Sequence, residues 1–381
     1  MFIWVGLLAT AALDSATLEM ITRSELLRGA STAAAAAASI RAGAAVTLAR
    51  SPLMPPLPAG CGLVGSRVVE FGPFGGRARV FYPCSPLIDA SSPAPYLTNG
   101  VETSDGISSL VGFNRVGLAW VTGHLARASS GCYQNEAPAT GLGQLPLLVY
   151  SHGYGGNMDM AAYLLRMVAA TGAVVMAVEH TDGTATSTRL SDGSVIPFSP
   201  GRLGTEGLAR RAAELRFGLD FCTALPAELS VLVDETRLFL GGHSYGGPSC
   251  LLALDGLLAT PGAANVAGLL LHDPAVRSQI RTPVRTLSYV SDQYAARGVR
   301  CGQTTLQCIG AAHGNFVDAA LWAPLPLMRA LSRLVIPVAG EIDPLRLYAA
   351  LACSAAAFMA GDDAAAARDG GCAELMQPLL D

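Results

Sequence analysis

The chain has 381 residues, which is long enough to bury a large core and fits a single α/β domain with extensions. Its formal net charge is −4 and no basic run stands out, which argues against nucleic acid as a partner. The nine cysteines are irregularly spaced and form no C-x-x-C motif, so we expect no zinc site, no other metal and no cofactor.

The first 55 residues have the composition of a targeting region. The apolar run from Phe2 to Leu13 is too short to span a bilayer and is similar to the hydrophobic part of a signal peptide, although no basic residue precedes it. The segment from Thr22 to Arg50 is rich in Ala, Ser and Arg, as in transit peptides. We therefore expect secretion or plastid targeting, and an ordinary Ala-rich helix fits the composition equally well.

A Pro-rich linker follows, and we expect a catalytic domain over 60–360 with 361–381 as a C-terminal tail. Alternating apolar residues predict strands at 67–71 and 77–82. Between Ile107 and Arg127 apolar side chains recur at helical spacing, which predicts a helix that packs in the core or lies on a lipid surface.

From residue 145 onward, apolar strands alternate with helices. Strands are predicted at 145–151, 173–178, 236–240, 266–271, 284–290 and 305–309, and helices at 158–170, 205–224 and 249–254. Near-continuous apolar strands are typical of a parallel sheet that is covered on both faces. The alternation therefore predicts an α/β protein with a doubly wound, mostly parallel sheet and helices on both faces.

The motif Gly242-x-Ser244-x-Gly246 lies between the predicted strand at 236–240 and the predicted helix at 249–254. A nucleophile elbow has this form, because its strained serine backbone needs small residues on both sides. This context indicates an α/β-hydrolase fold with Ser244 as the nucleophile. A glycine-rich turn with a solvent-facing serine is the alternative.

A serine nucleophile needs a histidine base that a carboxylate orients, and in α/β-hydrolases the chain order is serine, acid, histidine. Only His272 and His313 lie beyond Ser244, and we expect His313 as the base because it occupies a loop after the last predicted strand. Asp273 and Asp292 each follow a strand. The commoner arrangement favours Asp292, and the sequence pattern alone leaves both open.

The developing negative charge of the reaction needs backbone N–H groups to stabilise it. One is expected from Tyr245, the residue after the nucleophile. The other is expected from Tyr154, in the glycine-rich loop 151–156 that follows the first central strand. A phosphate-binding loop is excluded here because no lysine follows and the spacing of the glycines differs.

Four segments carry a family resemblance: Leu147–Gly155, Ala177–Asp182, Gly242–Gly247 and His313–Asp318. In this order and spacing they resemble the plasma-type platelet-activating-factor acetylhydrolases, which are calcium-independent phospholipases. The resemblance runs from about residue 60 to about residue 359. It implies hydrolysis of the sn-2 acetyl or short acyl ester of a phospholipid through an acyl-enzyme intermediate.

The resemblance also implies the roles of individual residues. Ser244 would be the nucleophile, His313 the base and Asp273 the acid, because that family takes its acid from the earlier strand. Tyr154 and Tyr245 would supply the oxyanion N–H groups without a metal. The chain departs from the family pattern in two places: Pro274-Ala275-Val276 replace aromatic residues after the acid, and the segment between the elbow strand and the preceding helix is shorter.

Three other functions remain open. A general carboxylesterase or polyesterase, or a pigment esterase if the chain is plastid-targeted, would use the same fold. A non-catalytic lipid-binding protein on this scaffold would not need Ser244, Asp273 and His313 together. The expected partner is a phospholipid or another ester, with contact to a lipid surface through 107–127.

Overall fold

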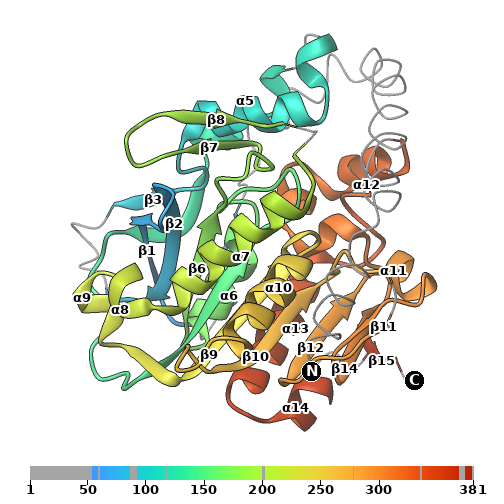
Figure 1. The fold of residues 1–381 in the computed structure, drawn as a ribbon. Helices are drawn as coiled ribbons and strands as arrows, with labels where there is room; N and C mark the ends of the chain where they lie inside the picture. Colours follow the sequence, from blue (N-terminus) through green and yellow to red (C-terminus); the bar gives the residue numbers. More distant parts are fainter. Residues whose placement is uncertain are drawn as a thin grey trace.

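The computed structural model describes residues 54–58, 61–85, 92–116, 119–199, 202–277, 279–334, 337–368 and 374–379. The targeting region expected over 1–55 therefore lies almost entirely outside the described residues. The described residues build a large mixed sheet with helices packed on both of its faces (Figure 1). This arrangement confirms the predicted doubly wound α/β class.

Six neighbouring strands form the parallel centre of the sheet, and their carboxyl ends carry the site described below. They are β5 (Leu145–Ser151), β6 (Val174–Glu179), β9 (Val233–His243), β10 (Val266–His272), β12 (Thr286–Val290) and β14 (Thr304–Cys308). All six coincide with predicted strands to within a few residues. β9 lies between β5 and β10, so the elbow motif stands at the middle of the sheet edge.

Antiparallel strands extend this centre on both sides. They are β1 (Val64–Phe71), β2 (Gly76–Pro83), β3 (Pro93–Pro95) and β4 (Ser129–Gln134) beyond β6, and β15 (Met376–Pro378) beyond β14. The full order is β15-β14-β12-β10-β9-β5-β6-β2-β1-β4-β3, in which only β1 and β4 of the added strands pair in parallel. The residues expected as a C-terminal tail thus supply an edge strand, together with helix α14 (Asp363–Arg368).

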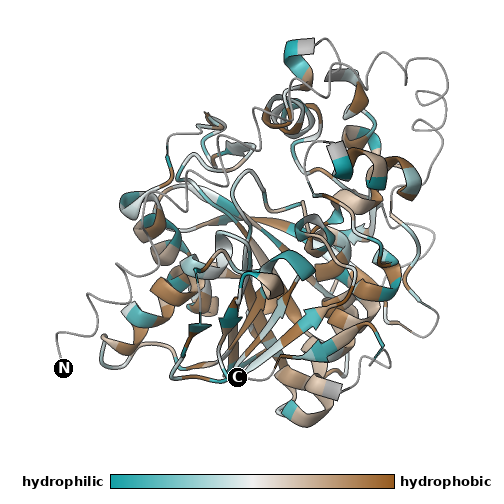
Figure 2. Cartoon of the chain, turned by 90° about the vertical axis from the view of Figure 1, so that its right-hand side faces the viewer, coloured by the Kyte–Doolittle hydropathy of each residue, from teal (hydrophilic) through white to brown (hydrophobic). Residues whose placement is uncertain are grey.

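Two helices cover each face of the central strands. α6 (Ala162–Ala170) and α13 (Pro344–Met359) pack together on one face, and α7 (Thr205–Leu219) and α10 (Gly246–Leu258) on the other. Hydrophobic residues gather on the strands and on the helix sides that face them (Figure 2). The helix expected over 205–224 ends at Leu219, and short helices α8 (Phe221–Ala224) and α9 (Ala227–Ser230) lead into β9.

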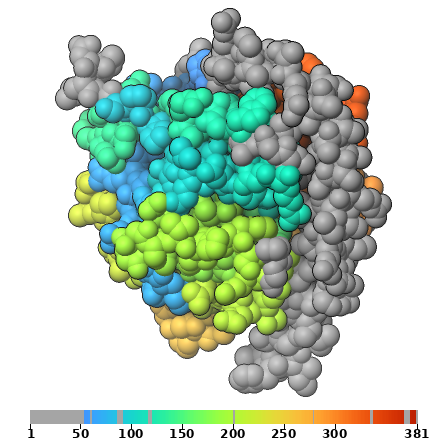
Figure 3. All heavy atoms as spheres, turned by 90° about the horizontal axis from the view of Figure 1, so that it is seen from above, coloured from blue at the N-terminus to red at the C-terminus, as the bar shows by residue number. Residues whose placement is uncertain are grey.

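The carboxyl edge is covered by two segments that we call the cap. The first contains α5 (Gly100–Leu110) and the 3-10 turns η1 (Phe113–Val116), η2 (Ala119–Val121) and η3 (Leu125–Arg127). The second is the hairpin of β7 (Ser187–Arg189) and β8 (Val195–Pro197). Seen from above, the two segments lie side by side on this face (Figure 3).

The predicted helix over 107–127 is wrong. α5 ends at Leu110, and Gly112 follows with φ +78°, a left-handed conformation that stops a helix. The chain then continues as short 3-10 turns, which bury Leu125 and leave Trp120 49% exposed. The apolar spacing in this segment therefore reflects separate turns that pack on the core. Among the described helices, none has the length and apolar character to cross a membrane.

Beside β12 and β14 lie the remaining small elements: α11 (Asp292–Ala296), β11 (Gln279–Ile280) and β13 (Arg300–Cys301), with η4 (His313–Phe316), η5 (Asp318–Leu321) and α12 (Leu325–Leu334) after β14. Cys301 on β13 and Cys308 on β14 are both buried and form no disulfide with each other.

A buried ion pair ties the antiparallel strands to the centre of the fold. The Arg79 guanidinium on β2 donates to the Asp159 carboxylate at 2.7 Å, and both side chains are almost fully buried. Arg79 also donates to the carbonyl oxygens of Pro95 and Tyr96, and the Asp159 carboxylate accepts from Thr98. The pair therefore joins β2, the start of the cap and the loop before α6.

We predict that Arg79→Met lowers the free energy of unfolding by about 3–5 kcal/mol, because the Asp159 carboxylate would stay buried without its cation. Urea denaturation measures this loss. Arg333→Met is the control, since Arg333 pairs with Glu341 at the surface and its side chain is 73% exposed. That change should cost about 0–1 kcal/mol. Equal losses in the two variants would contradict the role given to the buried pair.

Candidate active site

Ser244 stands at the turn from β9 into α10, and its backbone has φ +54°. A non-glycine residue rarely adopts this conformation, which costs on the order of 1–3 kcal/mol. The turn is possible because its neighbours lack side chains: a Cβ at Gly242 would lie 2.6 Å from the carbonyl oxygen of Gly246, and one at Gly246 would collide with the Ser151 carbonyl. The turn has the geometry of a nucleophile elbow.

A continuous hydrogen-bond chain connects Ser244, His313 and Asp273. The Nε2 atom of His313 lies 3.0 Å from Ser244 Oγ, and its Nδ1 atom lies 2.7 Å from Asp273 Oδ2. Asp273 is fully buried, whereas the His313 side chain is 24% exposed. The three residues come from the ends of β9 and β10 and from the loop after β14, so the fold brings together side chains that are distant in sequence.

The structure distinguishes the two candidate carboxylates. Asp273 directly follows β10, and both of its oxygens accept hydrogen bonds from Ser291, whose Oγ lies 2.8 Å from Oδ2. Asp292 begins α11, is exposed, and accepts from the side chain of Gln307 and the backbone N–H of Gly310. Only the Asp273 carboxylate contacts His313.

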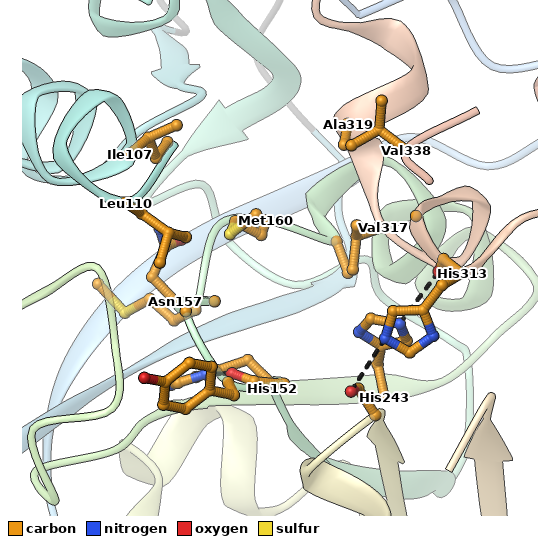
Figure 4. A pocket seen from close by; sticks show the side chains of 18 of the residues that line it. Ile107, Leu110, His152, Asn157, Met160, His243, His313, Val317, Ala319 and Val338 are labelled. Atoms are coloured by element: carbon orange, nitrogen blue, oxygen red, sulfur yellow. Dashed lines mark hydrogen bonds between the residues drawn. The ribbon is translucent and has the colours of Figure 1, made fainter. Parts of the chain in front are cut away.

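Two rings hold the imidazole of His313 in place. Tyr294 stacks on it with centroids 5.1 Å apart and an interplanar angle of 8°, and His243 lies 4.6 Å away on another side. The His243 Nε2 atom also lies 3.2 Å from the His313 carbonyl oxygen. Figure 4 shows the His313 and His243 rings beside each other at the edge of the pocket. Burial lowers the pKa of His243 well below its ordinary value, so its ring is neutral.

His272, the other histidine beyond Ser244, has a different environment. Its ring is buried, packs against Tyr289 and Phe316, and its Nδ1 lies 2.9 Å from the hydroxyl of Tyr150. Burial lowers its pKa to about 3. His272 ends β10 and packs in the core, whereas Asp273 lies just beyond the strand with a φ of +46° and contacts His313.

The loop that follows β5 lies directly against the elbow. A Cβ at Gly153 would lie 3.0 Å from Ser244 Cβ, which is a tight contact, so a glycine suits this close approach. Tyr154 comes next in the loop and lines the pocket that contains Ser244. Tyr245 directly precedes α10, and the first backbone N–H groups of a helix have no partner within it. The structure therefore brings both expected donor residues to the same place as Ser244.

Arg211 on α7 contacts this loop, and the sequence did not predict a role for it. Its guanidinium is fully buried, forms an ion pair with Asp182 at 2.7 Å and donates to the carbonyl oxygen of His152 at 2.7 Å. Its Cζ atom also lies 4.9 Å from the centre of the Tyr245 ring. Arg211 thus contacts both the loop after β5 and the side chain of the residue that follows Ser244. The only sequence signal was Asp182, which closes one of the segments that carry the family resemblance.

A second serine, histidine and carboxylate arrangement lies deeper in the fold. Ser151 Oγ is 2.7 Å from His180 Nε2, and His180 Nδ1 is 2.6 Å from the Glu214 carboxylate. Burial raises the pKa of Glu214 to about 7 and lowers that of His180 well below its ordinary value. Because Ser151 and His180 have no exposed surface, no substrate reaches them, and the set joins the ends of β5 and β6 to α7.

A mostly apolar cavity of about 160 Å³ opens beside Ser244. Figure 4 shows its walls: Ile107 and Leu110 of the cap on one side, Val317, Ala319 and Val338 on the other. In the parts of the chain that the structure describes, no three His, Cys, Asp or Glu side chains gather in a set that could hold a metal ion. The site is therefore a mostly apolar chamber whose wall contains Ser244 and His313, with His152 and His243 beside them.

The loop that carries His313 is anchored by a buried carboxyl group. Asp318 Oδ2 accepts from the Tyr163 backbone N–H at 2.9 Å, at the start of α6. Burial raises the pKa of Asp318 from its ordinary 3.8 to about 8. The folded protein therefore holds a proton on Asp318 that the unfolded chain releases above about pH 4, and this makes the fold less stable as the pH rises from about 4 towards 8.

We predict that Asp318→Asn, which cannot ionise, gains stability relative to the native protein as the pH rises. Between pH 5 and 7 the difference in the free energy of unfolding should grow by up to about 1.4 kcal/mol per pH unit. Urea denaturation at several pH values gives this slope. Asp192→Asn is the control: hydrogen bonds from Ser194 lower the pKa of the exposed Asp192, so its removal should give no slope in this range. A flat difference for Asp318→Asn would contradict the prediction.

Comparisons with known proteins agree with this geometry. The family model for platelet-activating factor acetylhydrolase, isoform II, matches residues 52–196, a segment that contains loop 151–156 and ends before Ser244. A ferulic acid esterase from Streptomyces cinnamoneus is similar over 87% of this chain and 100% of its own, with a TM-score of 0.62 and 19% identity, which shows the fold. The chain matches none of the curated proteins.

These findings confirm the expected α/β-hydrolase fold and the expected class of enzyme. The family match covers strands β1 to β7 and the loop after β5, and the structural likeness covers 87% of the chain. The chain is therefore a carboxylic ester hydrolase of the α/β-hydrolase fold that resembles the platelet-activating factor acetylhydrolases.

Proposed function

We propose that Ser244, His313 and Asp273 form a catalytic triad, and that the enzyme hydrolyses the sn-2 acetyl or short acyl ester of a phospholipid. The observation that carries the proposal is the hydrogen-bond chain from Ser244 Oγ through the His313 ring to Asp273, at 3.0 and 2.7 Å. These distances suit a histidine that takes a proton from the serine and a carboxylate that fixes its tautomer.

In the first step, the His313 Nε2 atom accepts the hydroxyl proton of Ser244 while Oγ forms a bond to the ester carbonyl carbon. The carbonyl oxygen becomes an oxyanion, which the backbone N–H groups of Tyr154 and Tyr245 stabilise. The tetrahedral intermediate collapses, the C–O bond to the alcohol breaks, and His313 returns its proton to the departing alkoxide. Asp273 accepts from Nδ1–H throughout and stabilises the imidazolium.

The second step returns the enzyme to its starting state. A water molecule gives a proton to His313 Nε2 and attacks the acyl carbon, forming a second tetrahedral intermediate in the same oxyanion site. When it collapses, the bond between the acyl carbon and Ser244 Oγ breaks, His313 gives its proton to Oγ, and the carboxylic acid is released. Ser291, which donates to both oxygens of Asp273, keeps this carboxylate aimed at His313 in both steps.

The size of the cavity supports a short acyl group. An engineered apolar cavity of about 150 Å³ takes up benzene, so the 160 Å³ beside Ser244 suits an acetyl or similarly small group. A cavity of this size and apolar character also suits a small non-lipid ester, which makes a general carboxylesterase the second candidate. Val101 and Trp120, both exposed on the cap, support contact with a lipid surface.

We predict that Ser244→Ala and His313→Ala each remove nearly all turnover, by several orders of magnitude, because triad members act as a unit. Asp273→Asn should lower kcat by roughly 10⁴-fold, since the imidazole would adopt the wrong tautomer. Asp292→Asn is the matched control, and it should leave kcat within a small factor. Steady-state kinetics on a chromogenic acetate ester, with circular dichroism to check folding, measure these effects.

Two results would overturn this assignment. Substantial esterase activity in a folded Ser244→Ala protein would remove Ser244 as the nucleophile. A large loss of kcat in Asp292→Asn, together with a small loss in Asp273→Asn, would exchange the roles of the two carboxylates.

We also predict that phosphatidylcholines with an acetyl or short sn-2 chain are cleaved faster than those with long sn-2 chains. The physical reason is that each buried methylene contributes about 0.8 kcal/mol only where an apolar cavity accepts it. The measurement is kcat/KM over a series of graded sn-2 length. Turnover of small esters together with inactivity on the whole lipid series would favour the general carboxylesterase instead.

A further inference from the structure

A second cavity of about 110 Å³ lies under the cap, next to the one that contains Ser244. Its walls come from the end of α5, from η1 to η3, and from the segment around α12. They consist of Ile107, Val111, Phe113, Val121, Thr122, His124, Leu125, Trp322, Ala323, Leu327, Met328, Leu331 and Val338. No residue of the hydrogen-bond chain described above lies in this wall.

The two cavities share a wall. Ile107, Val111, Trp322 and Val338 line both of them. In Figure 4, Ile107 and Val338 face each other across the upper part of the pocket, away from His152 and His243. The two cavities are therefore direct neighbours, with these four side chains between them.

The second cavity offers a ligand little but hydrocarbon surface, because its polar groups are already used within the protein. Thr122 Oγ1 donates to the Ser104 carbonyl oxygen at 3.1 Å. The ring of His124 has its Nδ1 atom 2.8 Å from the Val121 carbonyl and its Nε2 atom 2.7 Å from the Trp322 carbonyl. A ligand with polar groups at this depth would leave them without hydrogen bonds, at a cost in affinity.

We infer that this cavity is a subsite for the far end of one hydrocarbon chain of the ester substrate. The inference rests on the proposed site at Ser244 and adds to it a preference for a medium-length chain, longer than the first cavity holds by itself. The second cavity is too small, however, for a chain as long as the common membrane acyl groups. The same chemistry fits the acyl chain or the alcohol chain of the ester, and the experiment separates these two.

The test uses two series of esters and two variants with opposite effects. In one series the acyl chain of p-nitrophenyl esters grows from acetate to dodecanoate; in the other, acetates carry alcohols of growing chain length. Ala323→Phe fills the second cavity, and Leu327→Ala enlarges it. Ala330→Phe places the same ring on the exposed side of α12 and serves as the matched control. Thermal unfolding checks that each variant folds.

For the native enzyme, kcat/KM in one series should rise by roughly fourfold for each methylene that enters the second cavity. Ala323→Phe should abolish this rise and leave the shortest acetate within twofold of native, and Leu327→Ala should move the optimum to longer chains. The series that responds identifies the chain that the subsite holds. The inference would be overturned if Leu327→Ala and Ala323→Phe kept the native dependence of kcat/KM on chain length in both series. An equal loss of kcat/KM on all esters would overturn it too. Residual activity in Ser244→Ala would instead defeat the proposed function, and the two failures are therefore distinct.

Discussion

The strained turn at Ser244 is the constraint on which the rest of the site depends. Ser244 has a φ of +54° at the end of β9, and its Oγ atom lies 3.0 Å from His313 Nε2. The strain persists because the surroundings leave no alternative. Gly242 and Gly246 allow strand and helix to approach closely, and the Ser244 backbone is bonded to the neighbouring segment through His272 and Ala275.

Two buried ion pairs bind backbone groups near the site. Arg211 and Asp182 form a fully buried pair below the loop after β5, and Arg79 and Asp159 form another at the start of the cap. Such pairs add little net stability compared with apolar packing, but removing one partner is costly because it leaves a buried charge without its counter-ion. The carbonyl of His152 and the loop before α6 are held in this way.

In the proposed function, the cap selects the substrates that reach Ser244. The sheet edge by itself would leave Ser244 open to water, whereas Ile107 and Leu110 on one side and Val338 on the other enclose an apolar chamber above it. In the proposed function, the sheet thus carries the catalytic side chains, and elements inserted between its strands set the preference for an acyl or alkyl chain. This division explains how α/β-hydrolases share one mechanism and differ in substrate.

The sequence alone determined the parallel centre of the sheet and the identity of Ser244 and His313 as candidates, because buried strands, a glycine-flanked serine and chain order are local signals. It left Asp273 and Asp292 open, since both follow a strand and only the path of the chain shows that Asp292 turns to Gln307 and Gly310. The helix expected over 107–127 was wrong because apolar spacing cannot distinguish one helix from short turns that pack on the same core. Only the tertiary structure reveals the contacts of Arg211 and the second cavity. Both depend on segments that are far apart in the chain, which no local sequence pattern encodes.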